Sequence, residues 1–591
     1  MNLQSLTSPI PLHLHLRALG KRIRAHVRPA AHPALWFWLA FLVGNGLLFL
    51  PYPLLTPQRT QMLPLPGRDI RSVGDLLQWR GHMDLLRVYG EWVLLVTVWV
   101  LWSPRWGSGV KRVFRVLLPL LFGLMLVYQG YAAVMWELYH NQPNLYNDVP
   151  FIIGGLRFVL EAFHPPLSYY VLLGGALVGL LLLVGGTLYV ILFAVPADAL
   201  GRTSRGLLVA LSVLVLGQGI LYRSWLADPR WAVHSFTADI AANVQASLRS
   251  REAVQDLTRL NPYTLHDYTH YTLKGHPNVY LIFVESYGSI LYSDPFYRER
   301  YRSLMHTWQA RLEARGWHMV SSLSESPTWG GGSWLAYTSA MFGLRIPQHV
   351  QYLALREKYQ VLPYPNLGRF LHSKGYDYVW VVPITRKLSP RETEENRRFY
   401  GADRWITFED LDYHGPLYGW GPSPPDQFTL GYIGEFARHH EGPLFLFFLT
   451  QSSHYPWVPL PPVVDDWRTL ATAAFRGGSQ APEETDRLPF TQLRENYWQA
   501  IAYDLNMLGD FLLHLEDENA LVILIGDHQP PAVSARSDGY ATPIHVLSRD
   551  SGWLEEFRRR GFRPGLWLEN PQVTMGHEDV YEMIVMDLVK R

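Results

Sequence analysis

Carboxylate and imidazole side chains stand at the ends of short apolar segments in the second half of the sequence. Glu285 ends NVYLIFVE, Asp527 and His528 end LVILIGDH, and His454 follows the run PLFLFFLT. Carboxylate oxygen and imidazole nitrogen together suit a hard or borderline divalent cation. Because ligands gather beyond the carboxyl ends of parallel strands, these residues predict one metal-dependent site.

A glycine-rich segment, SPTWGGGSWLAYTSAMFGL at 326–344, is the second chemical feature. Its three consecutive glycines, Gly330, Gly331 and Gly332, let the backbone approach an anion closely. Ser333 then stands where a helix would begin, and Gly343 where it would end. A hydroxyl at a helix start beside a cation has a lowered pKa and can attack phosphorus. The segment alone is equally consistent with Ser333 being an ordinary N-cap.

The elements that must position these residues are strands alternating with helices. Strands are predicted at 278–286, 375–383, 443–450 and 521–527, with helices near 296–315 and 493–515, while 405–430 and 459–490 are predicted surface loops. Nearly continuous apolar strands between amphipathic helices indicate a mostly parallel sheet covered on both faces. The fold class predicted for this half is therefore an α/β domain.

Five apolar segments precede this domain, and each is long enough to span a bilayer, which needs about 20 residues of helix. They run over 34–55, 86–103, 114–136, 168–195 and 206–225. The second is the weakest, since Arg87 and Glu91 lie at its start. The predicted fold is thus a five-helix transmembrane anchor followed by the α/β domain.

Basic residues set the predicted orientation of this anchor. The N-terminal tail and the connections after the second and fourth segments hold most of them: Arg17, Lys21, Arg22, Arg24, Arg28, Arg105, Lys111, Arg112, Arg202 and Arg205. The loop 56–85 also carries arginines and departs from the pattern. We expect a cytoplasmic basic tail at 1–33, the spans within 34–225, a linker with a helix near 237–260 at 226–272, and an extracytoplasmic catalytic domain at 273–591.

Composition excludes several classes of function. The chain contains no cysteine, which rules out disulfides, thiolate zinc sites and cysteine nucleophiles. A formal net charge of +1 argues against nucleic acid as a partner.

Five motifs together resemble the alkaline phosphatase and sulfatase superfamily, and within it the lipoteichoic acid synthase and phosphoglycerol transferase branch, with phosphoethanolamine transferases as close relatives. The motifs are FVESYG (283–288), GGGSWLAYTSAMFG (330–343), QSSHYPW (451–457), ENYWQAIAYDLNMLGDF (495–511) and GDHQPP (526–531). The resemblance spans the anchor and the catalytic domain in the same order.

The resemblance implies roles for individual residues. Glu285, Asp527 and His528, together with the hydroxyl of Ser333, would hold one divalent cation (Mn, Mg or Zn). Ser333 falls where that family has its nucleophile, usually a threonine, and Thr328 is the rival. The substrate would be contacted by His454, Trp457, Thr328 and Arg391, although the sequence around Arg391 matches poorly. His545 lies within a strand-like ATPIHVLS and is expected to be structural.

The function that this resemblance implies is a metal-dependent transfer of phosphoglycerol or phosphoethanolamine through a covalent phospho-enzyme. The donor would be a membrane phospholipid and the acceptor an envelope glycan or lipid, at the bacterial cytoplasmic (inner) membrane with the catalytic domain periplasmic. Two alternatives stay open: a phosphodiesterase or sulfatase-like hydrolase of envelope esters, and a non-catalytic envelope-binding relative. A sulfatase is disfavoured, because it needs Cys or Ser in x-Pro-x-Arg context, and neither occurs near Ser333.

Overall fold

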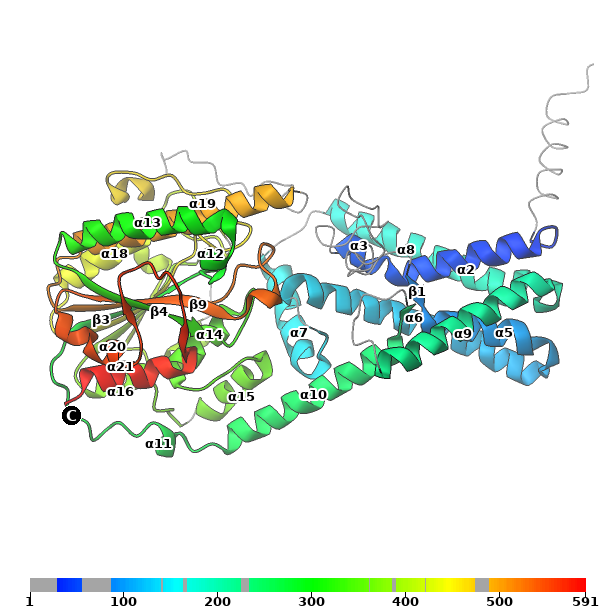
Figure 1. The fold of residues 1–591 in the computed structure, drawn as a ribbon, viewed down its shortest axis with the longest axis horizontal. Coiled ribbons are helices and arrows are strands. Elements are labelled where there is room, and N and C mark those ends of the chain that lie inside the picture. The colour runs from blue at the N-terminus through cyan, green and yellow to red at the C-terminus, as the bar shows by residue number, and fades with distance from the viewer. Residues whose placement is uncertain are drawn as a thin grey trace, which may run out of the picture. The chain divides into compact units, whose positions relative to one another are not determined.

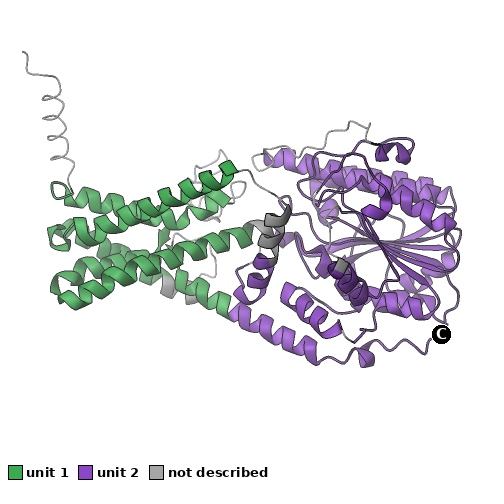
Figure 2. Ribbon diagram, turned by 180° about the vertical axis from the view of Figure 1, so that it is seen from behind, with its two compact units in different colours: residues 1–137, 163–244 green, residues 138–162, 245–591 purple. Residues whose placement is uncertain are grey.

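The computed structural model describes residues 29–55, 87–139, 142–162, 167–224, 233–360, 362–384, 390–419, 421–472 and 488–590. The chain divides into two compact units, Met1–Glu137 with Phe163–Val244, and Leu138–Ala162 with Gln245–Arg591 (Figure 2). Most of the predicted basic tail and the loop 56–85 lie outside the described residues.

The first unit consists mainly of apolar helices (Figure 1). A helix coincides with each of the five predicted spans: α2 Pro33–Phe49, α5 Gly90–Trp102, α6 Ser108–Tyr139, α8 Leu167–Tyr189 and α9 Arg202–Ser224. Short segments extend two of these helices, α3 Pro51–Leu55 after α2 and the π-helix Val190–Ala194 after α8. Two-residue strands, β1 Val88–Tyr89 and β2 Val233–His234, pair in parallel.

The structure supports fewer membrane-spanning helices than the five that were predicted. Among the described residues, one helix, Leu167–Ala194, is long and apolar enough to cross a membrane, while Pro33–Phe49 is apolar but shorter. The α5 helix has 13 residues, about 20 Å of length against a hydrocarbon core of about 30 Å. A five-span anchor is therefore not established by the fold.

A sheet of nine strands, counted over the described residues, forms the centre of the second unit. Its order is β10-β4-β9-β8-β3-β7-β5-β6, with β11 also paired to β4. The strands are β3 Asn278–Val284, β4 His318–Glu325, β5 Asp377–Val382, β6 Arg404–Thr407, β7 Leu444–Leu449, β8 Ala520–Gly526, β9 Ala541–Ser548, β10 Arg563–Pro564 and β11 Val573–Gly576. The pairs among β8, β3, β7, β5 and β6 are parallel, whereas β9 is antiparallel to both β8 and β4. The predicted mostly parallel sheet is thus confirmed, with an antiparallel part at one side.

Helices cover both faces of this sheet, which explains why its central strands are almost wholly apolar. On β3, Tyr280, Ile282 and Val284 pack into one core and Val279, Leu281 and Phe283 into the other. One face carries α12 Ile290–Ser293, α13 Pro295–Glu313, α18 Asp426–His439 and α19 Phe490–His514. The other carries α14 Ser333–Phe342, α15 His349–Tyr359, α16 Leu367–Ser373, α20 Glu555–Arg559 and α21 Val580–Leu588 (Figure 1).

Four further α-helices of the described residues have yet to be placed in the chain. The helix predicted near 237–260 is α10 Phe236–Arg259, and the short α11 Pro262–Leu265 follows it. The helix α7 Leu145–Ala162 lies between α6 and α8 in the sequence and belongs to the second unit. α17 Pro390–Tyr400 precedes β6.

Candidate active site

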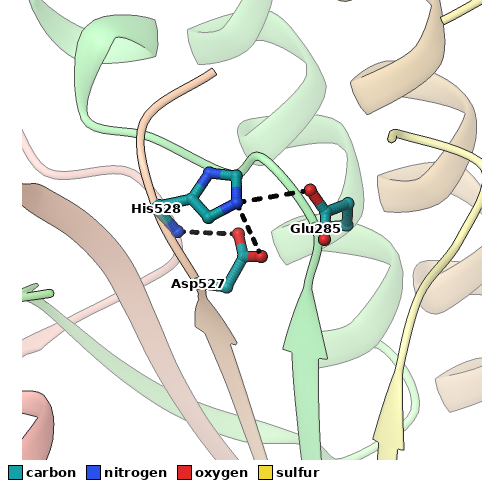
Figure 3. A group of neighbouring side chains, drawn as sticks. All are labelled: Glu285, Asp527 and His528. Atoms are coloured by element: carbon teal, nitrogen blue, oxygen red, sulfur yellow. Dashed lines mark hydrogen bonds and ion pairs between the residues drawn. The ribbon is translucent and has the colours of Figure 1, made fainter. Parts of the chain in front are cut away.

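The three predicted metal ligands meet where two neighbouring strands end. Val284 of β3 pairs with Gly526 of β8, so Glu285 and Asp527 leave the sheet side by side. One ligand atom from each of Glu285, Asp527 and His528 lies within 4.8 Å of the others, and all three side chains are buried (Figure 3). The juxtaposition needs glycine at 526, because a Cβ there would lie 1.9 Å from the carbonyl oxygen of Tyr287.

The ring of His528 presents a lone pair to the two carboxylates. Its Nδ1 lies 2.9 Å from the carbonyl oxygen of Gln529, so Nδ1 carries the proton in the neutral ring. Its Nε2 lies 3.5 Å from Glu285 Oε1 and 3.3 Å from Asp527 Oδ2 (Figure 3). Three electron-rich atoms that face one another in a buried site repel each other, and a positive charge between them would stabilise this arrangement.

The two carboxylate oxygens of Asp527 differ in their hydrogen bonds to the protein. Its Oδ1 accepts hydrogen bonds from the backbone N–H of Ser286 at 2.8 Å and of His528 at 2.7 Å. Its Oδ2 is buried without a hydrogen-bond partner in the described part of the chain. Burial, and then the negative charge of Asp527, raise the pKa of Glu285 well above its usual range. These residues therefore fit a divalent cation, which would satisfy Oδ2 and restore the ionised form of Glu285.

Ser333 reaches this cluster from the start of α14. The preceding glycines all have positive φ (68°, 146° and 80°), and Gly343, at φ 65°, follows the last residue of the helix. The helix limits predicted from the sequence are therefore confirmed. The Ser333 hydroxyl donates to Glu285 Oε2 at 3.0 Å and lies 3.4 Å from His528 Nε2.

Thr328, the rival hydroxyl, is used within the glycine loop. Its Oγ1 donates to the carbonyl oxygen of Gly331 at 2.5 Å, and its backbone N–H donates to Ser326 Oγ at 3.2 Å. A Cβ at position 332 would lie 3.1 Å from Thr328 Oγ1, so the loop closes tightly around this side chain. Thr328 holds the loop in shape, and Ser333 is the hydroxyl that faces the ligand cluster.

His454 lies in the loop after β7, the strand on the other side of β3. Its Nδ1 lies 2.6 Å from the carbonyl oxygen of Tyr455 and donates to it in the neutral ring. Burial lowers the pKa of His454 to about 4. At neutral pH its Nε2 is therefore an acceptor. This loop is also joined to Glu285, whose N–H donates to Thr450 Oγ1 at 3.0 Å and whose carbonyl accepts from Ser453 Oγ at 2.7 Å.

A buried pair of carboxyl groups, Asp426 and Asp504, supports the His454 loop and was not singled out from the sequence. Asp426 accepts the N–H of Gln451 at 2.8 Å and of Ser452 at 2.6 Å, and Asp504 accepts the N–H of Ser453 at 3.2 Å. The two carboxyl groups also hydrogen bond to each other. Burial and then the charge of Asp426 raise the pKa of Asp504 well above its usual range, so Asp504 keeps the shared proton. The sequence signal that could have revealed Asp504 is its position, as an acidic residue, on the apolar face of the helix over 495–511.

Two residues predicted to contact substrate are placed elsewhere. The Trp457 ring is buried in the core against Tyr455 and Tyr497, with ring centroids 5.1 and 5.2 Å apart, because the loop turns inward at this point. Arg391 begins α17 with its side chain 88% exposed and paired to Glu395 at 2.8 Å. The structure brings neither side chain to the ligand cluster, in contrast to the prediction.

A family model matches part of the second unit. The Sulfatase family model matches residues 340–556, a range that includes His454, Asp527 and His528, in agreement with the resemblance seen in the motifs. No curated protein matches the chain by sequence.

Solved structures similar to this chain include one synthase and two transferases. The lipoteichoic acid synthase LtaP of Listeria monocytogenes is 15% identical, with 56% of this chain and 78% of that chain covered at a TM-score of 0.35. The phosphoglycerol transferase GacH of Streptococcus pyogenes, in complex with sn-glycerol-1-phosphate, is 13% identical, with 56% of this chain and 82% of that chain covered at a TM-score of 0.35. The periplasmic domain of phosphoethanolamine transferase EptC of Campylobacter jejuni is 12% identical, with 54% of this chain and 89% of that chain covered at a TM-score of 0.33.

Proposed function

Starting from its sulfatase-family domain, we propose that this protein is a membrane-anchored, cation-dependent phosphotransferase. It transfers a phosphoglycerol or phosphoethanolamine group from a membrane phospholipid to an envelope glycan or lipid. The observation that carries the proposal is the position of Ser333, whose hydroxyl lies 3.0 Å from Glu285 and 3.4 Å from His528 at the start of α14. A hydroxyl in this position suits nucleophilic catalysis on phosphorus.

Glu285, Asp527 and His528, with the Ser333 oxygen, are the residues that hold the cation in this proposal. When bound, a divalent cation supplies positive charge that lowers the pKa of the serine hydroxyl and offsets charge on the phosphoryl oxygens. The helix dipole and the N–H groups at the start of α14 favour an anion at the same place.

The first step forms the bond between Ser333 Oγ and phosphorus and breaks the bond between phosphorus and the glyceride oxygen. The hydroxyl proton leaves Ser333 along its hydrogen bond to Glu285 and ends on the departing glyceride, so that diacylglycerol is released. In this proposal His454, which is neutral at pH 7, relays this proton.

In the second step, an acceptor hydroxyl attacks the phospho-serine, the bond to Ser333 Oγ breaks, and the serine regains its proton. His454 Nε2 can take the proton of the acceptor because burial keeps the ring neutral. Water as the acceptor would make the same chemistry hydrolytic. Anchoring favours transfer, since it keeps the site beside its lipid donor.

The anchor in this proposal is the set of apolar helices in the first unit, with the catalytic domain on the periplasmic side of the inner membrane. Exposed leucines of α8 support it: Leu172 and Leu182 are each 71% exposed. Soluble proteins rarely leave such residues clustered on one helix surface.

The test uses the full chain in lipid nanodiscs containing phosphatidylglycerol or phosphatidylethanolamine with a labelled headgroup. We expect diacylglycerol release and a phospho-alcohol adduct on the peptide that contains Ser333, with Mn²⁺, Mg²⁺ or Zn²⁺ present. Ser333→Ala is the matched control. Adduct formation followed only by release of free phospho-alcohol, with envelope acceptors present, would identify a hydrolase. Absence of any adduct with either lipid would contradict the proposal.

A further inference from the structure

The helix α7 Leu145–Ala162 has two unlike faces within its own unit. Large apolar residues are exposed along one side of its first half: Leu145, Tyr146, Val149, Ile152 and Ile153. Their spacing of i, i+1, i+4, i+7 and i+8 places them on a single stripe of the helix. An uninterrupted apolar stripe exposed on a folded domain indicates an interaction surface.

The opposite face of α7 is docked beside the catalytic serine. Phe151 stacks on Trp334, the residue after Ser333, with ring centroids 5.9 Å apart and planes 13° apart. It also meets His349 edge-on at 5.3 Å, and Asn147 Oδ1 accepts the N–H of Val350 at 3.2 Å. The apolar stripe is therefore rigidly tied to the start of α14.

A second anchor fixes the start of α7. Asn144 donates from Nδ2 to Ser250 Oγ of α10 at 2.7 Å, and its backbone N–H donates to the buried Asp148 at 2.8 Å. Asn144, Asn147 and Phe151 thus hold the helix to the domain, and the other large apolar residues described in its first half are left on the outside. This is the reverse of a helix that packs its apolar stripe into the core.

The position of α7 in the chain indicates what covers the stripe. α7 ends at Ala162 and α8, the helix able to cross a membrane, begins at Leu167. Five steps of the chain reach at most about 18 Å. If α8 spans the bilayer, as the proposed function requires, the end of α7 lies within that distance of the membrane face.

We propose that α7 is an interfacial helix whose stripe (Leu145, Tyr146, Val149, Ile152, Ile153) rests on a phospholipid bilayer surface. A helix with one apolar face, lying flat, is the form that binds at the boundary of headgroups and acyl chains. Through Phe151 and Trp334, this contact holds Ser333 at a fixed height above the bilayer. A lipid phosphodiester then meets the nucleophile without leaving the surface. The inference rests on the membrane anchoring in the proposed function.

The structural test exploits the absence of cysteine from the chain. In full-length protein in nanodiscs, Ile153→Cys and Val463→Cys are each labelled with an environment-sensitive fluorophore. Val463 is the control because its side chain is 63% exposed and that of Ile153 is 60% exposed. Doxyl-labelled phosphatidylcholine should quench the label at 153 several-fold and leave the label at 463 unchanged. Equal quenching at both positions, or a label at 153 that is shielded but not quenched, would overturn the proposal; the latter would indicate a protein partner.

A kinetic test separates this inference from the proposed function. Val149→Asp with Ile153→Asp should raise KM about tenfold for a donor in a bilayer and leave kcat unchanged for a short-chain, water-soluble phospholipid. Equal loss with both donors would indicate damage to the domain and overturn the inference. If the unmodified protein turned over neither donor, the proposed function would fail, while the quenching experiment would still decide the place of α7.

Discussion

At the scale of single residues, two hydroxyls in the glycine loop have separate tasks. Ser333→Ala should abolish turnover and the covalent adduct, because no other described hydroxyl donates to Glu285 Oε2. Thr328→Ala should keep the adduct and lower kcat about fivefold, since it removes one loop hydrogen bond worth about 1 kcal/mol. Ser333→Thr should keep part of the activity. Mass spectrometry of trapped protein checks this, and an adduct on Thr328 would show that the assignment is wrong.

The orphaned oxygen of Asp527 gives a second prediction for a single residue. Asp527→Ala should lose both metal and activity, because it removes a ligand and the acceptor of two backbone N–H groups. A chelator should lower the melting temperature of the unmodified protein, because a ligand at 1,000 times its Kd stabilises the folded state by about 4 kcal/mol. Metal analysis and thermal unfolding measure both effects. A metal-free Asp527→Ala protein with full activity would refute the site.

At the scale of elements, the loop after β7 is held by Asp426 on α18 and Asp504 on α19. Asp504→Asn should retain most activity, because its amide can donate to Asp426 and accept from Ser453 in place of the protonated carboxyl. Asp504→Leu leaves the buried N–H of Ser453 unpaired, at about 1–3 kcal/mol, and should lower kcat at least about tenfold. Steady-state kinetics with metal analysis test this. A role in core packing alone predicts the opposite order, with Leu tolerated better than Asn.

The strand β9 carries a buried histidine that makes stability depend on pH. His545 lies 2.7 Å from Ser321 Oγ and 2.8 Å from Tyr287 OH, and burial lowers its pKa from 6.5 to about 3. Between pH 6.5 and 3 the unfolded chain binds a proton at His545 that the folded chain does not bind. The contribution of His545 to the free energy of unfolding is therefore complete above pH 6.5 and decreases as the pH falls toward 3. Each pKa unit is worth about 1.4 kcal/mol.

Replacing this histidine tests its part in the acid sensitivity. In His545→Gln, which can hydrogen bond without titrating, the melting temperature should be lower at pH 7 but should decline less steeply between pH 6.5 and 4. Melting curves over this range measure the slope. An unchanged slope would assign the acid sensitivity to other buried groups, such as His577, whose pKa burial lowers to about 4.

At the scale of the whole molecule, the proposed orientation is testable with fusions. A reporter that works only outside the cytoplasm should be active after Arg230 and inactive after Ser204, because the basic connections are expected to remain inside. Alkaline phosphatase activity of the two fusions gives the answer. The opposite pattern would contradict both the orientation and the use of a lipid donor on the outer face.

The sequence was sufficient for the parallel strands and for Glu285, Ser333, Asp527 and His528, because each stands at the end of an apolar run or glycine loop. The sequence was insufficient for elements whose structure and burial depend on packing against distant parts of the chain. The range 405–430, predicted as a surface loop, contains β6 and the buried Asp426. β4 was not predicted because its serines break the apolar pattern of a buried strand. Its burial comes from partners far away in the sequence. Motif order alone could not place Arg391, which is exposed at the start of α17 and paired to Glu395.

The pairing of β3 with β8 has a consequence for when the proposed cation site can form during synthesis. Glu285 and Asp527 come from distant parts of the chain, and almost the whole domain must emerge before their strands can pair. A nascent chain that has passed the ribosome and the membrane only as far as β7 holds one carboxylate of the set. In the proposed function, cation capture would therefore be among the last events of maturation, and the metal available where the domain folds would determine which ion it receives.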